Sequence, residues 1–313
     1  MNVSLLLPSK LKAGDCIGIA PLAAPVEPGR FTSACNYIIS KGFRLKYQID
    51  PTRNYGSRKD LFSSYSPQER AEHLNNLFKD PEVSMVLAAK GGYGCMEVLP
   101  LLDFQAVRDN PKIFMGFSDI TAMLIALHME TGLVSIHGPT LESAFARSAE
   151  QAYQDCLDFT FSFLEGQPVT YPKPEVTIFS GSASGKLLGG NLSLLASLAG
   201  TRWQIDLDSA ILFIEDIAEK PYRIHRMLTQ LKLAGCFRGL QGVLVGSLRS
   251  CEGDNSSDPS LNDVLTDIFA ESSIPVFRYS EFGHVAANLP LPLGREVEIG
   301  PNGLKFLKLP FAT

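Results

Sequence analysis

The sequence predicts an α/β protein whose first domain is a parallel, doubly wound sheet, and two observations support this. First, short apolar segments typical of buried strands alternate with segments of helical spacing between residues 16 and 136. Second, distinctive turns follow three of these strands, at Gly91-Gly92, at Ser118 and at His137-Gly138-Pro139. Because ligand sites in such sheets lie at the carboxyl ends of strands, we expect the three turns to converge on one edge.

The first half of the chain supplies the alternation, element by element. We expect strands at residues 16–20, 44–48, 83–89, 113–115 and 133–136, and helices at residues 30–41, 67–78, 95–102 and 120–130. Ser66 is a candidate N-cap for the second helix, and Glu69 and Arg70 fall in its first turn. The run at 83–89 is almost continuously apolar, as expected for a strand covered on both faces.

The second half begins after a segment with few regular signals. Residues 165–184 carry Pro168, Pro172 and Pro174, which places a domain boundary near residues 165–180. Beyond it we expect strands at 185–188, 210–214, 242–246 and 276–279, helices at 192–200, 221–233 and 261–270, and terminal β structure at 297–307. The strand at 210–214 runs into Glu215-Asp216, and the strand at 276–279 precedes Gly283-His284.

Composition limits the class of protein. The 313 residues are 45% hydrophobic and 19% charged, as in an ordinary globular protein long enough for two domains. The net charge of -5 leaves no basic excess to neutralise nucleic-acid phosphates. The six cysteines are scattered without close pairs, so their spacing indicates neither a zinc site nor a disulfide framework. We therefore expect the protein to work in a reducing compartment. The apolar run at residues 5–7 is too short for a membrane span or signal peptide, so we expect a cytoplasmic protein.

Ser118 is the candidate nucleophile. A strand that turns sharply into a helix exposes the turn residue and presents free backbone N–H groups beside it, which is the geometry of a nucleophile elbow. The fit is partial, because Ile120 stands where the second glycine of that motif usually lies. The alternative is that Ser118 or Asp119 only caps the following helix.

His284 is the candidate general base among five histidines. His73 and His128 fall inside predicted helices, and His225 lies on a helix beside two arginines, whereas His284 follows a strand and Gly283 at the entrance to a loop. His137 lies near the predicted site but could serve only to shape its turn. A triad also needs a carboxylate, and both Glu215 and Asp216 qualify. Glu215 directly follows an apolar run, where a carboxylate is costly to bury without a partner.

Gly91-Gly92-Tyr93-Gly94 has three interpretations. As a phosphate loop it lacks the G-x-x-x-x-G-K-[ST] pattern. As an oxyanion hole it fits better, because glycines let the backbone approach a ligand and an N–H here could complement the N–H of Asp119. The third interpretation is an ordinary strand–helix turn.

Several motifs occur in order across almost the whole chain, namely Pro8-x-x-Leu11-x-x-Gly14-Asp15-x-Ile17, Glu69-Arg70, Gly91-Gly92-Tyr93-Gly94, Gly116-x-Ser118-Asp119, His137-Gly138-Pro139, Gly189-Gly190-Asn191-Leu192, Glu215-Asp216, Pro221-Tyr222-x-x-x-Arg226 and Gly283-His284. Taken together, these motifs resemble those of the LD-carboxypeptidase family of serine peptidases.

The resemblance implies a flavodoxin-like N-terminal domain over residues 1–170 and a smaller β-rich C-terminal domain over residues 171–313. It implies the catalytic residues Ser118 as nucleophile, His284 as base and Glu215 as the residue that orients the base. The N–H groups of Gly92 and Asp119 resemble the family's oxyanion hole, with Lys90 and Tyr93 beside them as substrate-binding residues.

The resemblance also implies an activity. Such enzymes cleave the bond before the terminal D-Ala of cytoplasmic murein tetrapeptides, without metal or cofactor and usually as homodimers. Related members hydrolyse a peptidyl-nucleotide antibiotic and confer immunity. In another class, a non-enzymatic ligand-binding protein of the same architecture would use Ser118 only as a helix cap.

Two departures from the family pattern concern the walls of the site. Lys90 stands where arginine is common, which keeps the charge but loses the planar fork. Leu22-Ala23-Ala24 replaces a run that usually contains serine and glycine. A substrate carboxylate also needs a cation, and Lys90 and three arginines of the second half are the candidates, namely Arg202, Arg223 and Arg226.

Overall fold

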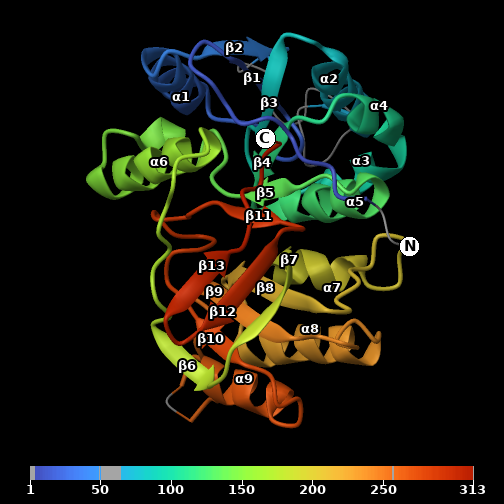
Figure 1. Ribbon diagram of the computed structural model, residues 1–313, viewed down its shortest axis with the longest axis vertical. Helices are drawn as coiled ribbons and strands as arrows, with labels where there is room; N and C mark the ends of the chain where they lie inside the picture. The colour runs from blue at the N-terminus through green and yellow to red at the C-terminus, as the bar shows by residue number, and fades with distance from the viewer. Residues whose placement is uncertain (1–3, 49, 51–64, 256, 313) are drawn as a thin grey trace. The chain divides into compact units, whose positions relative to one another are not determined.

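The computed structural model describes residues 4–48, 50, 65–255 and 257–312, and these fall into two compact units. The first unit comprises Met1–Val169 with Leu289–Pro292 and Leu309–Thr313, and the second, smaller unit comprises Thr170–Asn288 with Leu293–Lys308. The chain therefore returns twice to the first unit near its end. Figure 1 shows both units coloured along the chain.

A six-stranded sheet forms the centre of the first unit. Its strand order is β11-β5-β4-β3-β1-β2, and the neighbours from β2 through β5 are parallel. The order 2-1-3-4-5 is that of flavodoxin-like folds, so the predicted fold class is confirmed. The strands are β1 (Cys16–Ala20), β2 (Arg44–Tyr47), β3 (Val83–Ala88), β4 (Ile113–Gly116), β5 (Ser135–His137) and β11 (Leu291–Leu293).

Helices cover both faces of this sheet (Figure 1). They are α1 (Pro28–Ser40), α2 (Pro67–Lys79), α3 (Cys95–Val98), α4 (Phe104–Asp109), α5 (Thr121–Thr131) and α6 (Gln151–Leu164), with 3₁₀ turns η1 (Leu99–Leu101), η2 (Ser118–Ile120) and η3 (Phe145–Arg147). Ser66 caps α2 in a full capping box with Glu69, which confirms the predicted helix start. The helix expected at 95–102 is α3 followed by η1, where Pro100 limits α-helical hydrogen bonding.

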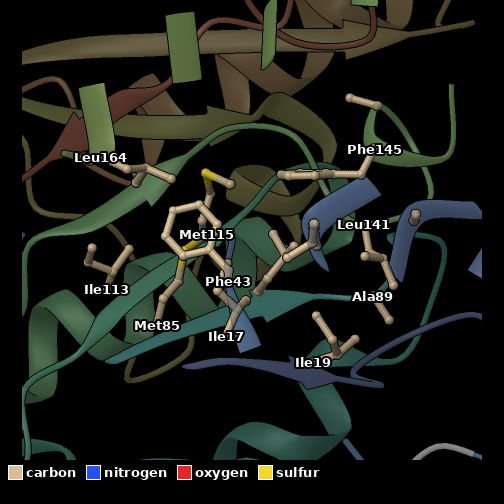
Figure 2. Close-up of a cluster of buried hydrophobic side chains, with 14 of the residues drawn as sticks. Ile17, Ile19, Phe43, Met85, Ala89, Ile113, Met115, Leu141, Phe145 and Leu164 are labelled. Carbon is tan, nitrogen blue, oxygen red and sulfur yellow. The ribbon is translucent and has the colours of Figure 1, made fainter. Parts of the chain in front are cut away.

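Alternation along the strands divides the apolar side chains between the two helical layers. Ile17 and Ile19 of β1 join one buried cluster, while the intervening Gly18 faces Leu77 of α2. Met85 and Leu87 of β3 point into the same cluster, which α1, η3 and α6 cover (Figure 2). The two-sided burial explains why these strands are apolar almost throughout.

A seven-stranded mixed sheet forms the second unit. Its order is β13-β12-β7-β8-β9-β10-β6, with β7 to β10 parallel and the outer strands antiparallel. The strands are β6 (Val176–Phe179), β7 (Ala183–Asn191), β8 (Ala210–Ile217), β9 (Gly242–Arg249), β10 (Val276–Arg278), β12 (Glu296–Gly300) and β13 (Gly303–Phe306). The helices are α7 (Leu192–Leu198), α8 (Pro221–Leu233) and α9 (Leu261–Phe269). β6 lies in the segment where the sequence carries few regular signals.

Candidate active site

Ser118 lies at a strained turn between β4 and α5. Phe117 is extended, Ser118 itself has φ of 64°, and the chain then enters η2 and α5. A positive φ is uncommon for serine and marks a backbone held in place by its surroundings. The N-cap positions fall on Phe117 for η2 and on Ile120 for α5, so neither Ser118 nor Asp119 occupies an N-cap position. The turn has the geometry of a nucleophile elbow.

The Gly91–Gly94 turn after β3 packs directly against this serine. A Cβ atom on Gly91 would lie 2.9 Å from Cβ of Ser118 and 3.1 Å from its Oγ, so any side chain there would collide with the serine. Ala24 donates its backbone N–H to the Gly91 carbonyl at 3.1 Å. The segment in which the sequence departs from the family pattern therefore contacts the turn itself.

The polar residues around this turn have defined partners. The carboxylate of Asp119 is buried and accepts the backbone N–H of Cys95 at 2.8 Å. Burial raises the pKa of this carboxyl above its ordinary value. Lys90 Nζ lies 2.9 Å from Oε1 of buried Glu142, so a substrate carboxylate would compete with Glu142 for this ammonium. Tyr93 projects from the turn with 54% of its surface exposed.

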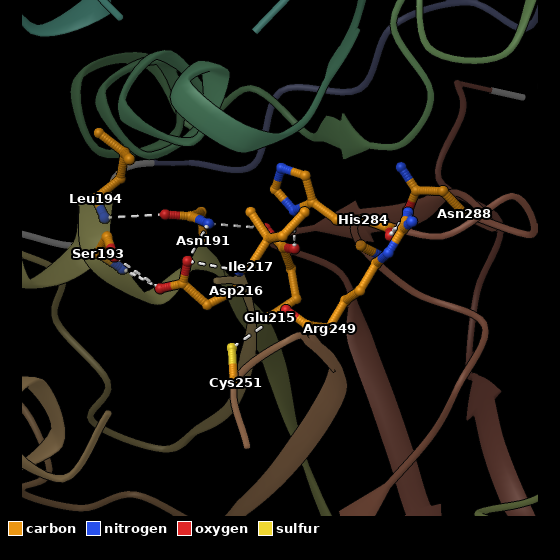
Figure 3. A network of polar contacts seen from close by, with 11 residues as sticks. Asn191, Ser193, Leu194, Glu215, Asp216, Ile217, Arg249, Cys251, His284 and Asn288 are labelled. Atoms are coloured by element: carbon orange, nitrogen blue, oxygen red, sulfur yellow. Dashed lines mark hydrogen bonds and ion pairs between the residues drawn. The ribbon is translucent and has the colours of Figure 1, made fainter. Parts of the chain in front are cut away.

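His284 and Glu215 form a bonded pair in the second unit. Nδ1 of His284 lies 2.6 Å from Oε2 of Glu215, whose side chain is completely buried, while the histidine side chain is 16% exposed (Figure 3). A proton on Nδ1 that is donated to the carboxylate leaves the lone pair on Nε2. That tautomer is the one in which a triad histidine accepts a proton from serine.

Asn191 holds the other oxygen of Glu215. Its Oδ1 accepts the backbone N–H of Leu194 at 3.2 Å, which orients the amide, and its Nδ2 lies 3.2 Å from Glu215 Oε1 and 3.1 Å from Asp216 Oδ1 (Figure 3). Asp216 in turn accepts the backbone N–H and the hydroxyl of Ser193 at 2.9 and 2.7 Å. The amide nitrogen of Asn191 thus bridges the two carboxylates.

Two consecutive carboxylates of β8 are both buried because β8 is a central strand that is buried on both faces from Ala210 to Asp216. The register between β8 and β9 shifts between Ile214 and Asp216, which turns neighbouring side chains out of strict alternation. β8 continues to Ile217, so the strand predicted at residues 210–214 ends too early and Glu215 lies within the strand. Burial raises the pKa of the Asp216 carboxyl, whereas the hydrogen bonds from Ser193 lower it.

Gly283 allows the histidine loop to approach this carboxylate. Its φ is +100°, and a Cβ atom there would lie 2.5 Å from Oε2 of Glu215. Its N–H donates to Oδ1 of Asn288 at 2.7 Å, which holds the loop that carries His284. A side chain at this position would therefore displace the carboxylate from the histidine.

The remaining histidines make other contacts, and His137 among them lies beside the serine turn. His137 is fully buried with its ring edge-to-face against Phe117, 6.0 Å between centroids. His73 packs against Tyr65, and His128 Nδ1 lies 3.3 Å from the carbonyl oxygen of Leu133. His225 Nε2 lies 2.9 Å from Asp267 on the surface of α8 and α9. These contacts are of the kind that stabilise the packing or the surface of a fold.

The candidate cations of the second half lie over aromatic rings. Arg202 lies 5.2 Å from the ring centroid of Trp203, and Arg223 and Arg226 lie 5.9 and 5.3 Å from that of Tyr222. All three are exposed, so they can meet an anionic ligand at the surface of this unit.

Arg70 is a further candidate, which lies in the Glu69-Arg70 motif but to which the sequence motifs assign no role. It is a fully buried arginine, 1% exposed, that donates to the carbonyls of Leu22 and Gly94 beside the turn. The available signal was its position on α2, because an arginine among the helix's apolar positions must find internal hydrogen-bond acceptors.

Two further properties concern the described residues as a whole. They bring together no group of three or more His, Cys, Asp or Glu side chains suited to a metal ion. None of the helices in this part of the chain combines the length and apolar character needed to cross a bilayer.

A strained serine at a strand–helix turn and a histidine bonded to a buried carboxylate are the groups that serine hydrolases use. Residues 17–138 match the family model described as the LD-carboxypeptidase N-terminal domain, and residues 184–299 match the one described as its C-terminal domain. The chain therefore belongs to the LD-carboxypeptidase family, as the sequence motifs predict. Membership makes it a hydrolase of the serine peptidase class.

Similar proteins fall into two functional groups by name. A Bacillus subtilis relative named probable murein peptide carboxypeptidase is 35% identical over 297 residues, 92% of this chain and 89% of the relative. The muramoyltetrapeptide carboxypeptidase structure from Oxalobacter formigenes has a TM-score of 0.77 at 29% identity, covering 93% of this chain and 97% of that one. An Escherichia coli relative is named microcin C7 self-immunity protein MccF. A structure of MccF in complex with glutamyl sulfamoyl guanosine has a TM-score of 0.87 at 25% identity, covering 98% of this chain and 100% of that one.

Proposed function

We propose that this protein is an L,D-carboxypeptidase that hydrolyses the bond before the terminal D-Ala of murein tetrapeptides and so serves cell-wall recycling. The observation that carries the proposal is the 2.6 Å contact between Nδ1 of His284 and buried Glu215, which prepares Nε2 as a base. The murein peptide names of two similar proteins support the substrate class.

In the first half of the reaction, Oγ of Ser118 attacks the carbonyl carbon of the scissile bond and its proton passes to Nε2 of His284. Glu215 stabilises the resulting imidazolium, and the N–H groups of Gly92 and Asp119 bind the oxyanion. When the tetrahedral intermediate collapses, the C–N bond breaks, His284 returns the proton to the leaving nitrogen, and D-Ala departs. An acyl ester on Ser118 remains.

In the second half, water attacks the ester with His284 again accepting the proton. The ester C–O bond breaks, Ser118 Oγ regains a proton from His284, and the tripeptide leaves with a free carboxylate. His284 therefore acts as base and then as acid in each half of the cycle.

The test is direct. The protein is incubated with a tetrapeptide that ends in D-Ala, the products are separated by liquid chromatography, and the quenched protein is examined by mass spectrometry. We expect tripeptide, D-Ala and an acyl adduct on Ser118, and no turnover by Ser118→Ala. Turnover that persists in that variant would refute the proposed nucleophile.

Stereochemistry tests the substrate class separately from the mechanism. Inverting the terminal D-Ala to L-Ala moves the carboxylate relative to the carbonyl under attack, and we expect a loss of about 10²-fold or more in kcat/KM. Amidating the terminal carboxylate should cost about 2–4 kcal/mol, as for one partner of a desolvated charge pair. Equal rates on the L,D and L,L peptides would remove the L,D-carboxypeptidase assignment while leaving a serine hydrolase.

The second candidate function is an immunity-type peptidase that cleaves a peptidyl- or aminoacyl-nucleotide antibiotic. The similarity to the MccF complex with glutamyl sulfamoyl guanosine favours it. A panel of muropeptides and aminoacyl-nucleotide analogues ranks the two by kcat/KM. Binding of either ligand without any turnover would instead indicate the non-enzymatic ligand-binding protein.

The proposal includes a cytoplasmic homodimer, as the family resemblance implies. Light scattering coupled to size-exclusion chromatography measures the mass in solution, and cell fractionation measures the compartment. A monomer, or a protein found outside the cytoplasmic fraction, would contradict this part of the proposal.

A further inference from the structure

One peptide group in the Gly91–Gly94 turn is held at both of its polar ends by side chains. The carbonyl of Gly94 accepts from Nη1 of Arg70 at 2.9 Å. The N–H of Cys95, which belongs to the same planar peptide, donates to Oδ2 of Asp119 at 2.8 Å. The position and the tilt of this peptide therefore depend on two side chains from outside the turn.

Arg70 connects the turn to a neighbouring segment. The same Nη1 donates to the carbonyl of Leu22 at 2.8 Å, and Nη2 donates to Oε2 of Glu97 at 2.7 Å. Leu22 follows β1 and Gly94 follows β3, which are adjacent strands of the sheet. A planar guanidinium suits this task because its donors have a fixed geometry. The guanidinium also forms an ion pair with the half-exposed carboxylate of Glu97.

The turn is shaped to admit this guanidinium. Gly94 has φ of +124°, and a Cβ atom there would lie 2.4 Å from Nη1 of Arg70. Glycine at this position thus serves two needs, a backbone conformation that other residues avoid and the space that the arginine occupies. The arginine and the turn are complementary in shape and in hydrogen bonding.

Asp119 has two roles in this arrangement. Its backbone N–H is one of the two proposed oxyanion donors, and it follows β4. Its carboxylate holds the Cys95 N–H in the turn after β3, which carries Gly92, the other proposed donor. The two donors thus come from neighbouring strands, and a side chain of one donor residue fixes the turn that carries the other.

We propose that Arg70 and the Asp119 carboxylate are positioning residues that preorganise the oxyanion hole by fixing the Gly94–Cys95 peptide. The inference rests on the proposed function, because it takes the N–H groups of Gly92 and Asp119 as the oxyanion donors. Neither side chain touches the reacting atoms. Donors that must move into place as charge develops stabilise the transition state less than donors already in place.

The experiment compares five single variants and one double variant with the wild type on the D-Ala tetrapeptide, measuring kcat and KM separately along with the melting temperature. Arg70→Met removes both carbonyl contacts, and Asp119→Ala removes the acceptor for Cys95. Arg70→Lys keeps the charge, and Asp119→Asn keeps an acceptor oxygen. Arg108→Met is the matched control, because Arg108 also donates to a backbone carbonyl, that of Glu130, but lies outside the turn.

We expect Arg70→Met and Asp119→Ala each to lower kcat by about 10²-fold, the effect of a misplaced catalytic group, with KM within about threefold of wild type. Asp119→Asn should recover most of the loss seen in Asp119→Ala, and Arg70→Lys should lie between Arg70→Met and wild type. The double variant Arg70→Met/Asp119→Ala should lose less than the product of the two single losses, because both side chains hold one peptide. Arg108→Met should match the wild type.

The proposal is overturned if folded Arg70→Met and Asp119→Ala keep kcat within threefold of wild type. It is also overturned if Asp119→Asn is as damaged as Asp119→Ala, or if the losses appear in KM. Should Arg70→Met fail to fold, kcat of Arg70→Lys and of the two Asp119 variants decides between the same two outcomes.

A fluorophosphonate labelling rate separates this inference from the proposed substrate. The reagent needs only an activated serine and an oxyanion hole, so wild type that labels but does not cleave the tetrapeptide refutes the substrate alone. In that case the variants should still lose about 10²-fold in labelling rate. Wild type that neither labels nor cleaves refutes the proposed mechanism and this inference with it.

Discussion

Replacing Glu215 by glutamine should disable the base through a hydrogen-bond conflict that the structure makes explicit. Oε2 of Glu215 faces Nδ1 of His284, and Oε1 faces the NH₂ group of Asn191, whose orientation is set by its bond from the Leu194 N–H. A glutamine has only one oxygen. If that oxygen faces His284, its NH₂ group meets the NH₂ group of Asn191; if it faces Asn191, its NH₂ group meets Nδ1.

The second orientation should prevail, and it favours the wrong histidine tautomer. Two buried NH₂ groups facing each other leave a donor unsatisfied, at about 1–3 kcal/mol, which is a factor of roughly 5 to 150 in population. A glutamine NH₂ donating to Nδ1 puts the histidine proton on Nε2, where no lone pair remains to accept from Ser118. Losing the charge opposite the imidazolium removes about a further factor of ten, since hydrogen bonds to charged groups are stronger by about 1–1.5 kcal/mol. We therefore expect kcat to fall about 10²–10³-fold.

The assay is kcat for D-Ala release by wild type, Glu215→Gln, Asn191→Ala and the double variant Asn191→Ala/Glu215→Gln. Removing the Asn191 amide removes the conflict, so the double variant should be several-fold faster than Glu215→Gln. Glu296→Gln, an exposed carboxylate on β12 of the same unit, is the control and should match wild type. A Glu215→Gln variant within tenfold of wild type, or a double variant showing the full product of the two single losses, would refute this reasoning.

Three further predictions follow from other parts of the site and the core. Ser118→Ala and His284→Ala should each lower turnover by roughly 10⁴–10⁶-fold, and the double variant should be little worse; a mild His284→Ala would identify a different base. All six cysteines are buried, and burial raises the pKa of Cys156 to about 12, so activity should survive thiol-blocking reagents. Ellman's reagent should count six thiols only after denaturation, and a rapid loss of activity on thiol blocking would contradict this prediction. Because burial raises the pKa of Asp119, the native state holds this proton more tightly than the unfolded state does. The free energy of unfolding of the wild type, measured relative to that of Asp119→Asn, should therefore fall as the pH rises from about 4 through the raised pKa. Urea titrations at a series of pH values measure this difference, and a rise with pH would be evidence against a raised pKa for Asp119.

Local sequence signals determined most of the secondary structure. Pro221–Leu233 is a helix at its predicted bounds, and Ser66 caps α2 through the capping box with Glu69. Caps, prolines and apolar periodicity act over a few residues, so they can be read without knowledge of the fold. The alternation of strands and helices was likewise sufficient for the parallel first sheet.

The sequence did not reveal two of the four edge strands, β6 and β11. β6 pairs with β10 across about a hundred residues of chain, and β11 joins the sheet of the first unit from near the other end of the chain. Such strands form because a neighbour offers unpaired backbone groups, and short, proline-containing segments such as Leu291–Leu293 carry little intrinsic preference of their own.

At the site, the sequence determined which turns are special, and only the tertiary structure decided which atoms meet. The elbow at Ser118 was predictable from a strand, a glycine and a helix in succession. Glu215 was favoured over Asp216 by the family motif and the apolar run before it, but the contacts themselves, Glu215 with His284 and Asp216 with Ser193, were not predictable. The contact of Arg70 with the Gly94 carbonyl was also out of reach, since it joins residues of different elements through a side chain whose direction depends on packing. Hydrogen-bond partners of this kind are decided by distances between elements, and those distances exist only once the sheet has formed.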